Sequence, residues 1–156
     1  MTALLRILAC GAIDRGDDGA AVRAVRALPP SALRWAQVEE VGQLSADLFM
    51  DDAPETQRVV VDCVAGLPLG EVVDLRLGDL PELEYRTGAT SSHGLSPGAA
   101  VGMAALVGAI RDDDRFMGIG GERFDLGAQM SPPVVEGLKR LVERLVERIE
   151  EAGPCA

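Results

Sequence analysis

The sequence predicts a single α/β domain, residues 1–156, with a twisted, mostly parallel sheet of about five strands and helices on both faces. Short apolar runs that are typical of buried strands alternate with segments whose apolar residues recur at helical spacing, and this alternation indicates a parallel or mixed sheet. A length of 156 residues is that of one domain, and the hydrophobic fraction of 47% is enough for a full core. No internal repeat or low-complexity linker divides the chain.

The first half of the chain is predicted to begin with a buried strand at residues 4–10, which Gly11 ends. A helix follows over residues 16–28. Asp17 and Asp18 suit its N-terminus, where free N–H groups and the helix dipole favour acids. The rest of this half is predicted to hold a weaker strand at residues 33–41, a short helix at residues 44–50 and a β-branched strand at residues 58–62.

The second half begins with alternating apolar and charged residues at 70–77, which predict an edge or half-exposed strand. Residues 85–94 are rich in Gly, Ser and Thr and are predicted to form a polar loop. The apolar run at 97–110 is too short to span a bilayer and predicts a buried helix. Ser131 as the cap and Pro132 in the first turn begin the last helix. Between these helices we expect a short strand at residues 116–119 and an irregular segment at residues 120–130.

The charge of the chain bears on its partners. There are 25 acidic and 15 basic residues, a formal net charge of −10. Nucleic acids and anionic membranes bind clustered Lys and Arg, so this charge argues against both. Three cysteines without regular spacing do not indicate a disulfide framework, and the N-terminus lacks the pattern of a secretion signal. We therefore expect a soluble, cytoplasmic protein, and the acidic surface favours a monomer.

Acidic residues follow two of the predicted strands. Asp17 and Asp18 come after the first strand, and Asp62 ends the third. In open α/β sheets, ligands bind beyond the carboxyl ends of the strands, where the strand order reverses. If the two strands are neighbours, the three carboxylates meet in one crevice. Taken singly, each acid also has a structural explanation, which is helix capping for the pair and a turn for Asp62.

His93 is the only histidine of the chain and lies in the predicted polar loop. Together with Asp62 and one acid of the first pair, it offers two carboxylates and one imidazole nitrogen. This set suits nickel, zinc or a similar divalent ion, with positions left open for water or a substrate group. A surface position would equally explain a lone loop histidine.

Other catalytic chemistries fit the sequence less well. Residues 94–98 match the G-x-S-x-G pattern, but Pro97 has no N–H for an oxyanion hole, and His93 precedes the serine instead of following it. A single histidine also excludes H-E-x-x-H zinc sites. Cys63 beside Asp62 could act as a nucleophile that His93 activates, but an inert thiol near the core is the better explanation.

A phospho-acceptor receiver domain is the main alternative. It too is a small doubly wound domain with an acid pair after its first strand and one acid after its third, as Asp17, Asp18 and Asp62 are placed here. Its mechanism needs a lysine at the end of the fifth strand, whereas the only lysine of this chain, Lys139, lies in the last predicted helix. A non-enzymatic metal- or phosphate-binding module, such as a degenerate receiver, is the second hypothesis.

Five short motifs resemble those of one known family. They are Gly16-Asp17-Asp18-Gly19 within residues 7–22, Val59-Val60-Val61-Asp62, Gly70-Glu71-Val72, Ser92-His93-Gly94-Leu95, and Met130-Ser131-Pro132 within residues 126–134. They are similar to the G-N-x-L-x-x-D-D/E-G-x-G, V-D-A, P-G-x-V, S-x-H-x-L and L-S-P-x-V motifs of the hydrogenase maturation endopeptidases. These enzymes remove a C-terminal extension from the large subunit of [NiFe] hydrogenases after nickel is inserted. The similarity runs over nearly the whole chain.

The resemblance implies a function and a site. Asp18, Asp62 and His93 would bind the metal, and Asp17 would be a supporting acid of the catalytic site. The partner would be a [NiFe] hydrogenase large-subunit precursor, and the nickel would be carried by that substrate, with zinc or cadmium able to occupy the same ligands in vitro. The chain departs from the family at Ala12 for an Asn, at residues 41–44 for D-G-G-T, and at residues 120–121 for Q-P.

Overall fold

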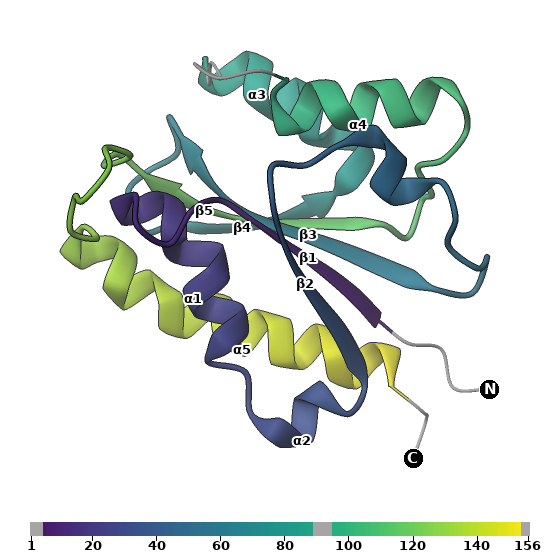
Figure 1. Ribbon diagram of the computed structural model, residues 1–156, viewed down its shortest axis with the longest axis horizontal. Helices are drawn as coiled ribbons and strands as arrows, with labels where there is room; N and C mark the ends of the chain where they lie inside the picture. The colour runs from purple at the N-terminus through teal and green to yellow at the C-terminus, as the bar shows by residue number, and fades with distance from the viewer. Residues whose placement is uncertain (1–4, 89–94, 154–156) are drawn as a thin grey trace.

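A five-stranded sheet lies between two layers of helices in the computed structural model, which describes residues 5–88 and 95–153 (Figure 1). The strand order is β2-β1-β3-β5-β4, and every neighbouring pair is parallel except β4 with β5, which is antiparallel. The predicted fold class is therefore confirmed, including the edge position of the fourth strand. The strands are β1 (Leu5–Cys10), β2 (Ala36–Gly42), β3 (Gln57–Ala65), β4 (Val72–Arg76) and β5 (Arg115–Gly121).

The helices divide between the two faces of the sheet (Figure 1). One face packs against α1 (Ala20–Arg26) and α5 (Pro132–Ala152), and the other against α3 (Leu80–Thr87) and α4 (Pro97–Leu106). Successive residues of a strand point to opposite faces, so β1 contributes Leu5 and Ile7 to one core and Leu8 to the other. The short elements are η1 (Gly16–Gly19), α2 (Pro30–Leu33), η2 (Ala46–Phe49) and η3 (Leu77–Asp79).

Two predicted elements have other bounds in the structure. The polar loop expected at residues 85–94 is wrong at its start, because α3 continues to Thr87 and ends at Gly88, whose φ is 67°. Residues 89–94 lie outside the described part of the chain. The strand predicted to end at Asp62 continues for three more residues, because β5 pairs with β3 as far as Ala65.

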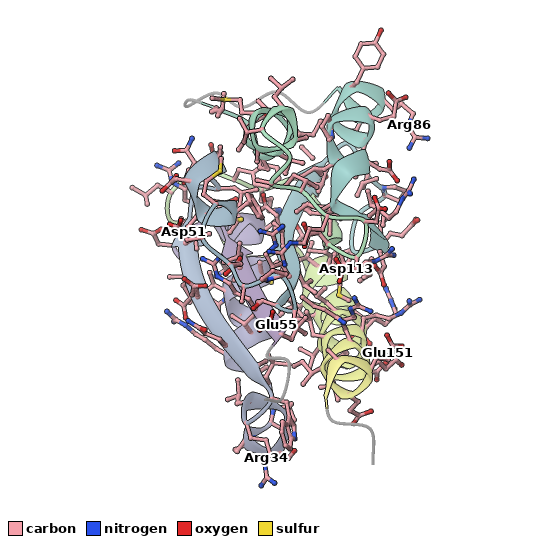
Figure 2. All side chains as sticks on the ribbon, turned by 90° about the vertical axis from the view of Figure 1, so that its right-hand side faces the viewer. Arg34, Asp51, Glu55, Arg86, Asp113 and Glu151 are labelled. Carbon is pink, nitrogen blue, oxygen red and sulfur yellow. The ribbon has the colours of Figure 1, made fainter. Side chains whose placement is uncertain are left out.

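The predicted buried helix is buried on one side only. α4 packs Ala100, Val101 and Ala104 into the core, whereas Met103 and Leu106 are 52% and 87% exposed. Elsewhere the surface is strongly charged, as the outward side chains of Asp51, Asp113 and Glu151 illustrate (Figure 2). Across residues 5–88 and 95–153, no helix has the length and apolar character needed to cross a membrane.

A buried ion pair closes the end of the sheet opposite to the site described below. Arg58 and Asp114 are both 0% exposed, and the Arg58 Nε donates to Asp114 Oδ1 at 2.9 Å. The same guanidinium also donates to the main-chain oxygens of Phe49 and Ala109. The start of β3 is thereby joined to the two segments that flank it, so all of these hydrogen bonds serve the fold.

Candidate active site

The strand order reverses between β1 and β3, and this point opens into the site. The β1–β3 ladder ends at the pair Ala9 and Val61, while β3 stays paired with β5 up to Ala65. Asp62 is therefore the first residue of β3 beyond its ladder with β1. Ligands of open α/β sheets bind at such a position.

Asp18 reaches the same point from the turn that follows β1. Its Oδ2 accepts a hydrogen bond from the Ala12 N–H at 2.9 Å, and its own N–H donates to the Arg15 oxygen at 3.1 Å. Gly11 makes this turn possible, because its φ is 101° and a Cβ there would lie 2.0 Å from the main-chain oxygen of Asp18. The carboxylate is thus fixed by the main chain of its own loop.

Asp62 is 9% exposed, and among the described residues its carboxylate accepts one hydrogen bond and forms no ion pair. Burial, followed by the charge of Asp18 and then that of Glu84, raises the pKa of Asp62 to about 8, and only the hydrogen bond from the Cys63 N–H at 2.8 Å opposes this. The two acids repel each other, and neither forms an ion pair with the described residues. A cation bound between them would favour the ionised form of Asp62.

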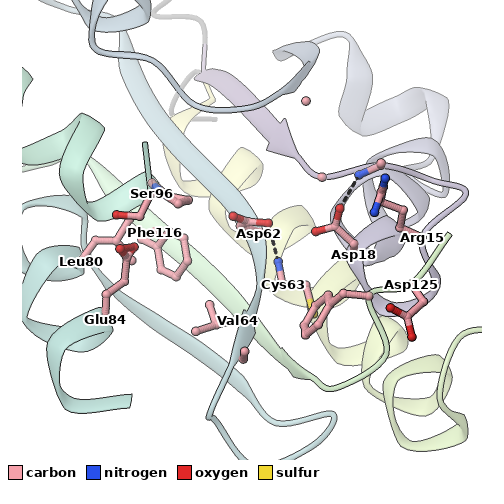
Figure 3. Close-up of a pocket in the computed structure, with 16 residues that line it drawn as sticks. Arg15, Asp18, Asp62, Cys63, Val64, Leu80, Glu84, Ser96, Phe116 and Asp125 are labelled. Carbon is pink, nitrogen blue, oxygen red and sulfur yellow. Dashed lines mark hydrogen bonds between the residues drawn. The ribbon is translucent and has the colours of Figure 1, made fainter. Parts of the chain in front are cut away.

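Both carboxylates face one cavity of about 620 Å³. Figure 3 shows Asp62 in the middle of its lining, with Asp18 and Arg15 on one side and Glu84 and Ser96 on the other. Apolar side chains such as Leu80, Phe116 and Phe124 lie among these polar groups in the lining. The other residues of the lining are Gly11, Ala12, Gly42, Cys63, Val64, Ala65, Pro97 and Asp125.

Asp17, the predicted supporting acid, is not part of this lining and is 0% exposed. One of its oxygens accepts from the N–H groups of Glu122 and Arg123 at 2.9 Å and from the Ser131 hydroxyl at 2.8 Å, and the other accepts from the Ser131 N–H at 2.7 Å. Burial would raise the pKa of Asp17, but these four hydrogen bonds outweigh it, and the pKa is lowered. In this arrangement Asp17 supports the site by anchoring residues 122–131, which carry Phe124 and Asp125 to the cavity.

The third predicted metal ligand, His93, lies outside the described residues. In the parts of the chain that are described, no three side chains of His, Cys, Asp or Glu are grouped closely enough to hold a metal ion. Of the three predicted ligands, the described residues contain only Asp18 and Asp62. Ser96, three residues after His93 in the sequence, lines the cavity.

Two cysteines lie near the carboxylates. Burial first, and then the negative charge of Asp62, raises the pKa of the thiol of both Cys10 and Cys63. A thiol with a raised pKa stays protonated and is a poor nucleophile and metal ligand. This environment supports the sequence-based interpretation of Cys63 as an inert thiol.

Sequence analysis missed Glu84 as a member of the site, because α3 was not predicted. Its Oε2 accepts a hydrogen bond from the Gly98 N–H at 2.7 Å, at the start of α4. A Cβ at position 98 would lie 2.6 Å from the other carboxylate oxygen, so a larger residue there would force the Glu84 carboxylate to shift. A glycine directly after the Ser-Pro start of a helix is the only local signal, and it does not indicate which acid approaches.

Solved structures of hydrogenase maturation endopeptidases have the same fold. The [NiFe] hydrogenase maturation protease HybD from Thermococcus kodakarensis is 28% identical, with a TM-score of 0.66 over 97% of this chain and 99% of that one. The hydrogenase maturating endopeptidase HybD from Escherichia coli is 19% identical, with a TM-score of 0.72 over 96% and 94% of the two chains. The resemblance inferred from the sequence motifs is thereby confirmed.

A further structure, an endopeptidase from Escherichia coli solved in solution, is 20% identical and has a TM-score of 0.74 over 96% of this chain and 94% of its own. No protein-family model matches the chain, and no curated protein matches it in sequence. The likeness is thus carried by the fold over almost the full length of both partners in each comparison.

Proposed function

We propose that this protein is an endopeptidase that removes the C-terminal extension of a [NiFe] hydrogenase large-subunit precursor after nickel insertion. It would recognise the nickel of the precursor through Asp18, Asp62 and His93. The observation that carries the proposal is a pair of carboxylates, Asp62 on β3 and Asp18 in the turn after β1, which face one cavity and form no ion pair with the described residues. The full-length likeness to maturation endopeptidases supplies the class of substrate.

The geometry suggests how the residues would act. Asp18 and Asp62 would take open positions on the substrate's nickel and so fix the nearby peptide against the cavity wall. The ion polarises the scissile carbonyl or a water molecule. Water then adds to the carbonyl carbon, the C–N bond breaks, and the water proton passes through a base to the leaving amine. Asp17 is not that base, because four hydrogen bonds occupy its buried carboxylate.

The cavity also fits a peptide better than a phosphate. Its volume of about 620 Å³ lies within the range of sites that enclose a small ligand or a few residues of chain. Among the described lining residues there are four carboxylates and one guanidinium, a balance that repels a phosphoryl group. The receiver-like alternative is therefore less well supported than the peptidase.

The proposal is tested by incubating the protein with large-subunit precursors, with and without nickel, and measuring the intact mass of the precursor. Loss of a C-terminal fragment from the nickel-loaded form alone is expected. Asp18→Asn, Asp62→Asn and His93→Ala should abolish this loss while the far-UV circular dichroism stays unchanged. Asp14→Asn is the matched control, because Asp14 is an exposed acid of the same loop. Normal processing by His93→Ala would remove that residue from the site.

A further inference from the structure

Arg15 is the only cation among the described residues that line the cavity, where it faces four carboxylates. It lies in the turn between β1 and η1 and is half-buried. Its main chain is fixed on both sides, because the Arg15 N–H donates to the Ala12 oxygen and the Arg15 oxygen accepts from the Asp18 N–H, both at 3.1 Å. The side chain therefore starts from a rigid turn, beside Asp18 in the view of Figure 3.

The guanidinium of Arg15 has no protein partner within residues 5–88 and 95–153. Two acids of the lining accept main-chain hydrogen bonds instead: Asp18 accepts from the Ala12 N–H, and Glu84, on the opposite side of the cavity, from the Gly98 N–H. Other arginines of this chain do pair with acids, as Arg58 does with Asp114 and Arg115 with Asp74. An arginine that is unpaired among the described residues, in a cavity lined by four acids, has its five N–H donors available to a ligand.

The chemistry of the guanidinium defines what it would bind. Its planar donors match two oxygens of a carboxylate, or the carbonyl oxygens of an extended peptide, and they do so better than a lysine ammonium. We infer that Arg15 binds a carboxylate or main-chain carbonyl oxygen of the peptide segment that enters the cavity, and so determines how that segment is positioned. This inference rests on the proposed peptidase function.

The position of Arg15 fits such a role. Asp18 follows it by three residues in one rigid turn, so an oxygen held by Arg15 stays at a fixed offset from a metal held by Asp18. Phe124 also lines the cavity and offers an apolar surface for the peptide. Arg15 would then act on binding, and Asp18 and Asp62 on the reaction itself.

The test compares Arg15→Gln, Arg15→Lys and the control Arg23→Gln in the full-length protein. Arg23 is an exposed arginine of α1 that makes no ion pair with the described residues, so the control has the same charge change at a remote site. For a nickel-loaded precursor, Arg15→Gln should raise KM about tenfold or more with kcat within a factor of about three. Arg15→Lys should give an intermediate KM, and all three variants should keep the wild-type melting temperature.

The outcomes separate this inference from the function on which it rests. If the wild type cleaves and Arg15→Gln has the KM of Arg23→Gln, the inference is wrong and the peptidase stands. A fall in kcat at unchanged KM would overturn the binding role as well. If the wild type does not cleave any nickel-loaded precursor, both proposals fail. A precursor whose extension has amidated carboxyl groups identifies the oxygen that Arg15 binds. If that oxygen belongs to a carboxylate, the wild type should cleave the amidated precursor with the raised KM of Arg15→Gln. If it is a main-chain carbonyl oxygen, the KM of the wild type should not change.

Discussion

The most informative structural prediction concerns Asp17→Asn. The wild-type carboxylate accepts four hydrogen bonds of 2.7–2.9 Å, three at one oxygen and one at the other. An asparagine can keep its oxygen on the side with three donors. Its amide nitrogen then faces the Ser131 N–H, so that two donors meet in a place that is 0% exposed.

The cost follows from these contacts. The three retained hydrogen bonds lose their charge, which removes about 0.5 kcal/mol each, and one buried donor loses its acceptor, which costs about 1–3 kcal/mol. We expect the free energy of unfolding to fall by about 3 kcal/mol, equivalent to a melting temperature lower by roughly 6–12 °C. Asp14→Asn in the same loop is exposed and should change the free energy of unfolding by less than about 0.5 kcal/mol.

The pH dependence of this effect has a defined sign. The folded-state pKa of Asp17 is lowered below its ordinary value of 3.8, so its contribution is present above that value and is lost as the pH falls through the folded-state pKa. Urea unfolding, followed by the fluorescence of Trp35, should therefore show wild type and Asp17→Asn converging below about pH 4. Equal stability of the two proteins at pH 7 would refute the assigned role of Asp17.

Three further predictions concern other parts of the molecule. In the metal-free protein the pKa of Asp62 is raised, so the free energy of unfolding should fall as the pH rises from 3.8 towards 8. Asp62→Asn should flatten this profile and add about 3 kcal/mol at pH 8, measured by urea titration with a chelator present. This is half of the ~6 kcal/mol that the full pKa shift corresponds to, because the carboxylate faces an open cavity. Asp114→Ala leaves the buried Arg58 with a single, more distant counter-charge, Asp52 at 3.4 Å, and should cost about 3 kcal/mol in the same titration. A cost below about 1 kcal/mol would contradict the assignment. Gly98→Ala places a Cβ 2.6 Å from a carboxylate oxygen of Glu84 and should lower the melting temperature measured by calorimetry. Gly102→Ala, where a Cβ meets nothing within 4 Å, should raise the melting temperature.

The sequence predicted well those elements whose pattern is local. The apolar runs of β1 and β3 and Pro132 in the first turn of α5 are such local signals, whereas the Ser131 hydroxyl makes no cap hydrogen bond and donates to Asp17 instead. α3 was not predicted, because only two of its eight residues, Leu80 and Leu83, are buried, and two apolar positions are too few to show helical spacing. Its packing against α4 stabilises it instead.

The candidate site was predictable only in part. Asp18 approaches Asp62 because β1 and β3 are neighbours in the sheet. The sequence alone does not determine which strands are neighbours. Which acid of the first pair faces the cavity depends on the turn at Gly16, whose φ is 58° and whose Cβ would lie 2.6 Å from the Arg123 oxygen. Such close contacts between distant segments leave no periodic signal in the sequence.

The most direct test of the proposed function is the intact mass of a nickel-loaded large-subunit precursor after incubation with the wild type and with Asp62→Asn, beside the nickel-free precursor. The wild type should release a C-terminal fragment from the nickel-loaded form only, and Asp62→Asn should release none. Release of the same fragment from the nickel-free precursor, or by Asp62→Asn, would contradict metal recognition by the carboxylates at the β1–β3 switch point.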